Sequence, residues 1–178
     1  MMSARASSME WVLRAIALSN LVFDSIWRRK WLWMTGISAL LGFNHWFTLG
    51  INASQSLPNH AFLVLKQDHG VTRGDYVTFR WHGGGPYLPG VKFTKIVRGV
   101  PGDVVSRQGN DLYINGEFVS TAKPRATTGQ PLLAGPVGVI PEGRYYVHAT
   151  NKDSLDSRYL ITGWISREAI VGKALPLF

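Results

Sequence analysis

The chain contains 178 residues, of which 46% are hydrophobic, and it has seven Trp, no Cys and a formal net charge of +8. This length indicates one principal domain with an appended segment, and the apolar content excludes an intrinsically disordered chain. The absence of Cys excludes a disulfide scaffold, a Cys-ligated zinc site, an iron–sulfur cluster and a thiol nucleophile. Five Lys and Arg accompany two Asp and Glu in residues 1–50, and fourteen accompany nine in residues 51–178. The positive charge is therefore spread thinly, without the dense basic run typical of a nucleic-acid arm, and we expect no nucleic-acid partner.

The first thirty residues contain a predicted helix at 9–27. Its only charged residues are Glu10, Arg14 and Asp24. The uncharged run between Arg14 and Asp24 is too short to cross a bilayer. We expect an amphipathic helix on the cytoplasmic face of a membrane. The alternative is a helix that packs against another membrane protein.

Residues 31–50 (WLWMTGISALLGFNHWFTLG) contain no Lys, Arg, Asp or Glu. As a helix they would extend about 30 Å, the thickness of a hydrocarbon core, with Trp residues near both ends. The basic run at 28–30 (RRK) precedes them, so the positive-inside rule places the N-terminus in the cytoplasm and residues 51–178 across the membrane. We predict a single-pass anchor. A buried core helix is the alternative, and a cleaved signal peptide fits poorly because thirty residues precede the run.

From residue 51 onward the pattern changes to short segments rich in β-branched and aromatic residues. Turn residues such as Gly, Pro and Asp separate these segments, and no long helical pattern follows. We predict a mainly β domain over residues 51–178, with a long surface loop at 122–138. The expected strands lie at 61–66, 76–81, 92–97, 111–116 and 145–149.

Several known site patterns are incomplete or absent in this sequence. Residues 82–85 (HGGG) are similar to an esterase oxyanion loop, but the chain has no Gly-x-Ser-x-Gly elbow, so a flexible loop is the better interpretation. The five His residues lack metal-ligand spacing, which makes a metal site improbable. Walker A and Rossmann glycine patterns are also absent.

Three blocks remain: residues 52–58 (NASQSLP), 95–103 (KIVRGVPGD) and 151–159 (NKDSLDSRY). In this order they resemble the type I signal peptidases (family S26) over roughly residues 31–178. The first resembles the Ser-x-Ser-Met-x-Pro nucleophile box in a shortened form, similar to the compact branch that includes conjugative-transfer, TraF-like pilin peptidases. The second resembles the lysine box, and the third resembles Gly-Asp-Asn-x-x-x-Ser-x-Asp-Ser-Arg. Residues 73–79 (RGDYVTF) also resemble the Gly-Asp-x-Val strand of the family.

The resemblance implies a serine endopeptidase with Ser56 as the nucleophile and Lys95 as the general base. A lysine acts as a base only when burial lowers its pKa towards the working pH. Strand alternation places Lys95 on one face with Phe93 and Val97, which favours such burial. The alternative is a surface lysine beside a buried Ile96.

The remaining roles also follow from the resemblance. Ser54 would donate to the oxyanion beside the backbone N–H of Ser56, Ser154 would hydrogen-bond and orient Lys95, and Asp156 with Arg158 would form a supporting salt bridge. A simple turn serine is the alternative at Ser54, and a solvated surface run is the alternative for the Asp-Ser-Arg segment. Two departures from the family pattern are Leu57 in place of Met and the pair at 149–150 (AT) in place of Gly-Asp.

The resemblance therefore implies a signal-peptidase-like antiparallel β catalytic domain with a small cap, preceded by an N-terminal transmembrane helix. We expect a cytoplasmic segment at 1–30, an anchor at 31–50 and a periplasmic catalytic domain at 51–178, in a bacterial inner membrane. The implied substrates are exported pre-proteins with small residues before the cleavage site, among them a conjugative pre-pilin, and membrane lipid is the other partner. No cofactor is implied, and the oligomeric state is not predicted. A non-catalytic peptide-binding or secretion-complex scaffold is the alternative function.

Overall fold

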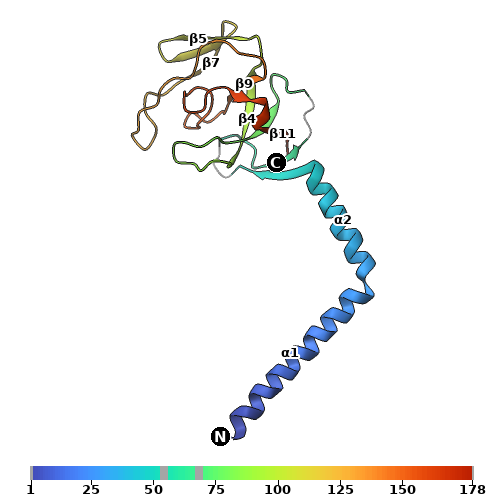
Figure 1. Ribbon diagram of the computed structural model, residues 1–178. Coiled ribbons are helices and arrows are strands. Elements are labelled where there is room, and N and C mark those ends of the chain that lie inside the picture. Colours follow the sequence, from blue (N-terminus) through green and yellow to red (C-terminus); the bar gives the residue numbers. More distant parts are fainter. Residues whose placement is uncertain (1, 53–55, 67–69, 178) are drawn as a thin grey trace. The chain divides into compact units, whose positions relative to one another are not determined.

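The computed structural model describes residues 2–52, 56–66 and 70–177, which divide into two units at Asn44 and His45. The first unit is helical, and the second is built from strands (Figure 1). We describe each unit by itself.

The N-terminal unit contains helices α1 (Met2–Arg28) and α2 (Lys30–Trp46), separated by Arg29 alone. Helix α1 is longer than the expected 9–27, and α2 ends four residues before the end of the predicted span at residue 50. Within the described residues, neither helix combines the length and the apolar character needed to span a bilayer.

The end of the apolar run is a strand and not a helix. Residues 47–51 form β1 (Phe47–Ile51), which pairs antiparallel with β2 (Ala61–Leu65). The pairing continues at both ends, where Lys66 N–H donates to Trp46 O over 2.9 Å and Asn52 N–H donates to His60 O over 2.9 Å. Hydropathy alone could not find this change, because an apolar run suits a buried helix and a buried strand equally.

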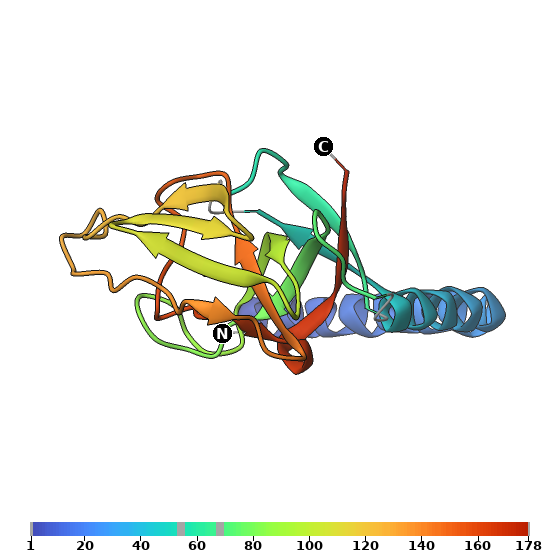
Figure 2. The ribbon, with the colours of Figure 1, turned by 90° about the horizontal axis from the view of Figure 1, so that it is seen from above.

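Two antiparallel sheets make up the second unit, which confirms the prediction of a mainly β domain. Among the described residues, the larger sheet has the strand order β1-β2-β11-β3-β4-β9-β10 and the smaller has the order β7-β6-β5-β8. Figure 2 shows the smaller sheet (yellow) at the end of this unit remote from β1 and β11. The remaining strands are β3 (Tyr76–Arg80), β4 (Lys92–Gly99), β5 (Val104–Gln108), β6 (Asp111–Ile114), β7 (Glu117–Thr121), β8 (Gly138–Val139), β9 (Arg144–His148), β10 (Ile165–Ser166) and β11 (Ile170–Pro176), and a short 3₁₀ helix covers Arg167–Ala169.

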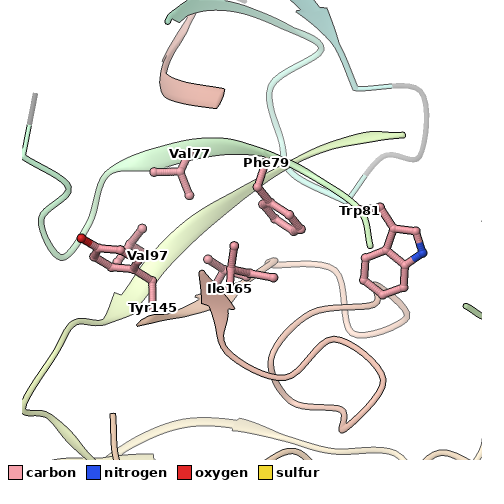
Figure 3. Packing of buried hydrophobic residues seen from close by; sticks show 7 residues of the cluster. Val77, Phe79, Trp81, Val97, Tyr145 and Ile165 are labelled. Atoms are coloured by element: carbon pink, nitrogen blue, oxygen red, sulfur yellow. The ribbon is translucent and has the colours of Figure 1, made fainter. Parts of the chain in front are cut away.

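Strand alternation builds the core that supports β4. In β3, Val77 and Phe79 point into a cluster that also contains Val97 of β4, while Thr78 between them hydrogen-bonds Thr94 on the opposite face over 2.8 Å. Figure 3 shows this cluster, whose members are Val77, Phe79, Trp81, Val97, Tyr145, Val147 and Ile165. Each fully buried Val or Phe side chain contributes about 1.5–3 kcal/mol relative to exposure. Strand β4 is therefore held firmly on both faces.

Candidate active site

Ser56 lies in a tight turn that is fixed from two sides. Its side chain is 3% exposed, and its Oγ donates to Asn52 Oδ1 over 3.3 Å. Its backbone carbonyl accepts Asn151 N–H at 3.2 Å and Thr150 Oγ1–H at 3.4 Å. Leu57 anchors the turn by packing among buried apolar residues that include Ile96 of β4. These contacts bring the first sequence block against the third.

Lys95 is a buried lysine in the middle of β4. It is 3% exposed, which excludes the alternative of a surface lysine. Its Nζ lies 5.7 Å from the centroid of the Phe93 ring, on the face that alternation predicted. Burial lowers the pKa of Lys95 to about 8, while Asp156 raises it and Arg158 lowers it further. A substantial fraction of this side chain is thus a neutral amine near pH 8.

The third block supplies the hydrogen-bond partner of Lys95. Lys95 Nζ donates to Ser154 Oγ over 2.7 Å, which is the contact that the resemblance implies. Within the described residues, Ser56 Oγ and Lys95 Nζ therefore have different partners, although both side chains line the same cavity. Hydrogen bonds of an unliganded site are often rearranged when substrate binds.

Asp156 and Arg158 form a buried ion pair beneath Ser154. Arg158 Nε donates to Asp156 Oδ1 and Nη2 donates to Oδ2, both over 2.8 Å. The two residues are 0% and 2% exposed, so the Asp-Ser-Arg segment is not a solvated surface run. Arg158 Nη2 also donates to the carbonyls of Asn151 at 2.9 Å and Ser154 at 3.2 Å. The pair thus holds the loop that presents Ser154 to Lys95.

Ser54 lies outside the described residues. Asn52 is a site residue to which sequence reasoning assigned no role. Its Nδ2 donates to Leu57 O at 2.9 Å and Asn59 O at 3.0 Å, so its side chain closes the turn around Ser56. The signal available in the sequence was the preference of Asn for turns in which its side chain bonds nearby backbone groups.

A cavity of about 620 Å³ opens beside Ser56 and Lys95. Its walls come from the loop after β3, from β4, from residues 123–132 and from residues 151–161. Part of the predicted loop at 122–138 is held against the site, because Lys123 forms an ion pair with Asp153 and its N–H donates to Tyr159 Oη over 3.3 Å. In the part of the chain that the structure describes, no cluster of three or more His, Asp or Glu side chains could hold a metal ion.

Comparison with known proteins gives the family of the chain. A family model described as "Signal peptidase, peptidase S26" matches residues 30–178. The chain belongs to this family. It is 30% identical to a signal peptidase I of Pseudomonas fluorescens, over 60% of this chain and 48% of that protein. It is 36% identical to a signal peptidase I of Bacillus licheniformis, over 49% of this chain and 51% of that protein.

A solved structure of a signal peptidase I from Enterococcus faecalis V583 is also similar, with a TM-score of 0.40 and 23% identity, over 60% of this chain and 98% of that chain. The chain spans about half the length of the curated relatives that it matches.

Ala149 and Thr150, which stand in place of the expected Gly-Asp pair, both hydrogen-bond residues of the site. Ala149 is fully buried among apolar side chains, and its N–H donates to Asp156 Oδ2 over 2.8 Å. The next residue, Thr150, is exposed and directs its hydroxyl to the carbonyl of Ser56. Asp156, which accepts the Ala149 N–H, is the carboxylate that raises the pKa of Lys95 against the larger effect of burial.

Proposed function

We propose that this protein is a membrane-bound serine endopeptidase that removes signal sequences from exported pre-proteins, with Ser56 and Lys95 as its catalytic dyad. The observation that carries the proposal is a buried lysine with a lowered pKa on the same cavity as a buried serine. A serine hydroxyl becomes a useful nucleophile only beside a base, and a desolvated lysine can be that base. The roles of Ser154, Asp156 and Arg158 belong to the same proposal.

In the first half of the reaction, the neutral amine of Lys95 takes the proton of the Ser56 hydroxyl. The Ser56 oxygen then attacks the carbonyl carbon of the scissile peptide bond. When the tetrahedral intermediate collapses, the C–N bond breaks and the Lys95 ammonium returns a proton to the leaving amine. Ser154 would orient Lys95 throughout these steps, because it is the hydrogen-bond partner of Nζ.

The second half repeats these proton transfers with water. Lys95 takes a proton from a water molecule, whose oxygen attacks the ester carbonyl of the acyl-enzyme. Ser56 then leaves with a proton from Lys95, and the signal sequence is released with a free carboxylate. Developing negative charge on the carbonyl oxygen requires donors, which on this proposal are the Ser54 hydroxyl and the Ser56 N–H. The Ser56 N–H lies 3.4 Å from Asn52 Oδ1, a long contact that a substrate oxygen would replace.

The edge of β4 offers a place for the substrate. Residues 92–96 of β4 pair with β3 on one side, whereas pairing with β9 begins only at Ile96. In the described part of the chain, the free side of residues 92–95 has no strand partner. An extended substrate segment could add there as a strand and place its scissile bond at Ser56. Small residues before that bond, and a conjugative pre-pilin as substrate, remain part of the proposal.

Association with membrane lipid is supported separately by each unit. Helix α2 exposes large apolar side chains on all sides and has no buried residue. A helix of this kind is normally covered by protein or lipid. In the second unit, the register aligns Leu49 of β1, Leu63 of β2 and Leu175 of β11 on one sheet face, with Ile51 (86% exposed) at the edge. We propose that the helical part of the apolar run, residues 31–46, anchors the chain in a bacterial inner membrane, with residues 1–30 cytoplasmic and residues 47–178 periplasmic, since β1 belongs to the sheet of the second unit.

The test uses the full chain in detergent with a pre-protein substrate. We expect Ser56→Ala and Lys95→Ala each to abolish cleavage while the folded β signal in circular dichroism is kept. Lys92→Ala is the matched control, because Lys92 lies on the same strand but is exposed. Cleavage retained in either dyad variant would refute the proposal. Protease digestion of sealed vesicles tests the topology, since the proposed orientation leaves residues 51–178 accessible from the periplasmic side only.

A further inference from the structure

The cavity beside the dyad is larger than small substrate side chains require. Its volume of about 620 Å³ lies within the range of about 300–1,000 Å³ typical of sites that enclose whole ligands. Only part of its lining is polar. Six of the side chains that line it are large and apolar or aromatic: Tyr87, Phe93, Leu132, Leu155, Tyr159 and Ile161.

These six side chains form one apolar compartment. Phe93 and Ile161 pack against the core cluster around Val97, while Leu132, Leu155 and Ile161 pack against the second cluster, which contains Tyr159. Ile161 therefore joins the two groups. The Tyr87 ring extends the compartment, because its centroid lies 5.0 Å from that of Phe93 in an edge-to-face arrangement.

One wall of the compartment is fixed by the glycine loop after β3. Gly85 has a φ of 62°, and a Cβ added there would lie 3.2 Å from Ile161 Cδ1, so the loop approaches Ile161 closely because it lacks side chains. Trp81 Nε1 donates to Gly84 O over 3.1 Å, and a His82 ring nitrogen hydrogen-bonds Ile161 O over 2.9 Å. The opposite wall is fixed where Leu160 N–H donates to Leu133 O and Gly135 N–H donates to Arg158 O. Preformed walls reduce the ordering cost of binding.

The compartment begins close to the dyad. Phe93 and Lys95 lie on the same face of β4, two residues apart, which corresponds to about 7 Å along a strand. A substrate strand running along this edge would therefore place a residue within about two positions of its scissile bond over the compartment.

We propose that this compartment binds a bulky apolar side chain of the substrate, within about two residues of the scissile bond, and thereby selects among pre-proteins. The inference rests on the proposed function, because it takes Ser56 as the site of cleavage. It adds a second requirement to the small residues before the bond. Leu132, Tyr87 and Ile161 are the specificity-determining residues.

The experiment uses the full chain in detergent and a set of fluorogenic peptides with Ala-Gly-Ala before the cleaved bond. Leu, Phe and Trp replace Ala in turn at each of the first two positions after the bond, and replace Gly at the second position before it. We expect one position at which a bulky residue raises kcat/KM about 10- to 100-fold over Ala, as burial of such a side chain predicts.

Two variants connect that preference with the compartment. Leu132→Trp narrows the compartment at the wall formed by Leu132, and we expect the ratio of kcat/KM for the bulky and the Ala peptide to fall towards 1. Leu133→Trp is the matched control, because Leu133 is 69% exposed and does not line the cavity, and its ratio should equal that of wild type. Thermal unfolding of both variants verifies that they fold.

The outcomes separate the two proposals. If wild type cleaves none of the peptides and also fails on pre-proteins, the proposed function is wrong. If it cleaves the Ala peptide but prefers a bulky residue nowhere, the function stands and the compartment proposal is overturned. If the Leu132→Trp variant folds and keeps the preference for the bulky residue, the compartment proposal is also overturned. If that variant does not fold, the comparison of peptides with the wild-type protein still tests the proposal.

Discussion

The pH dependence of cleavage should report the protonation of Lys95. Burial lowers the pKa of this lysine from 10.5 to about 8. With that pKa, about one tenth of the side chains are neutral at pH 7, half at pH 8 and about nine tenths at pH 9. Because only the neutral amine can accept the proton of Ser56, kcat/KM should rise about tenfold from pH 7 to a plateau above pH 9.

The same group affects stability, with a definite sign. The unfolded chain titrates Lys95 near 10.5 and the folded chain near 8, so the unfolded state binds more protons between these values. The free energy of unfolding should therefore increase with pH across this window, by about 3 kcal/mol from this lysine. Below pH 8, Lys95 is mostly charged in the folded chain, so the folded state bears the full free-energy cost of burying this charge.

Lys95→Met isolates this contribution, because Met keeps much of the volume and carries no charge. Urea unfolding of wild type and variant at pH 7, 8, 9 and 10.5 gives the difference in unfolding free energy at each pH. We expect the variant to be the more stable at pH 7, with its advantage shrinking by about 3 kcal/mol towards pH 10.5, and to be inactive throughout. Other groups titrate in both proteins and cancel in the difference.

Two results would refute this reasoning. A kcat/KM profile that still rises steeply at pH 10 would show that the base is an ordinary exposed amine. A stability difference that does not change between pH 8 and pH 10.5 would show that the pKa of Lys95 is the same in the folded and the unfolded chain.

Four further predictions concern the groups around the dyad. Ser154→Ala removes the acceptor of the Lys95 Nζ hydrogen bond and should lower kcat about 10- to 100-fold with little change in Tm, since Ser154 is only half-buried. Arg158→Leu leaves Asp156 buried without its cation, so the pKa of Lys95 should rise and the increase of kcat/KM with pH should occur at higher pH. The free energy of unfolding in urea should fall by about 3–5 kcal/mol. An unchanged pH profile would contradict the assigned electrostatics. Asn52→Ala removes the two hydrogen bonds that Nδ2 donates and the two that Oδ1 accepts from Ser56, and it should reduce kcat more than stability. Asn59→Ala keeps the backbone acceptor and should leave both near wild type. For Asp103, burial raises the pKa, but hydrogen bonds from Val100 N–H, Asn115 and Arg73 outweigh burial and hold the pKa below 3.8. The ionised carboxylate therefore stabilises the folded state above about pH 4, and this contribution is lost as the pH falls through the lower pKa of the folded chain. Asp103→Asn should lower the free energy of unfolding by about 1–3 kcal/mol in urea at pH 7.

The strands that were predicted from the sequence are those whose own residues show a strong strand pattern. Residues 76–81 and 92–97 alternate β-branched or aromatic residues between clear turns, and they form β3 and β4. Strand β11 was not predicted, because its pairing with both β2 and β3 comes from opposite ends of the sequence and leaves little local trace. Strand β1 was not predicted either, because the helix before it and the strand itself are both apolar and hydropathy does not change where one ends and the other begins.

The site was predictable to the extent that it depends on motifs and on strand alternation. Alternation placed Lys95 on the face of Phe93 and Val97, and the blocks indicated which serines accompany it. The cavity walls were not predictable, because residues 123–132 owe their position to contacts such as Lys123 with Asp153, thirty residues apart. A loop that is held by long-range polar contacts has the same composition as one that is not.

The Asp156–Arg158 pair bears on how Lys95, the proposed base, can keep a lowered pKa although the buried carboxylate of Asp156 raises it. Alone, Asp156 would stabilise the Lys95 ammonium and keep the amine protonated. Arg158 is bound to Asp156 through two hydrogen bonds of 2.8 Å and opposes its effect on Lys95, and burial, the largest cause, lowers the pKa of Lys95. The ion pair thus holds the loop that carries Ser154, while Arg158 reduces the effect of the Asp156 charge on Lys95, as the proposed role of Lys95 as a base requires.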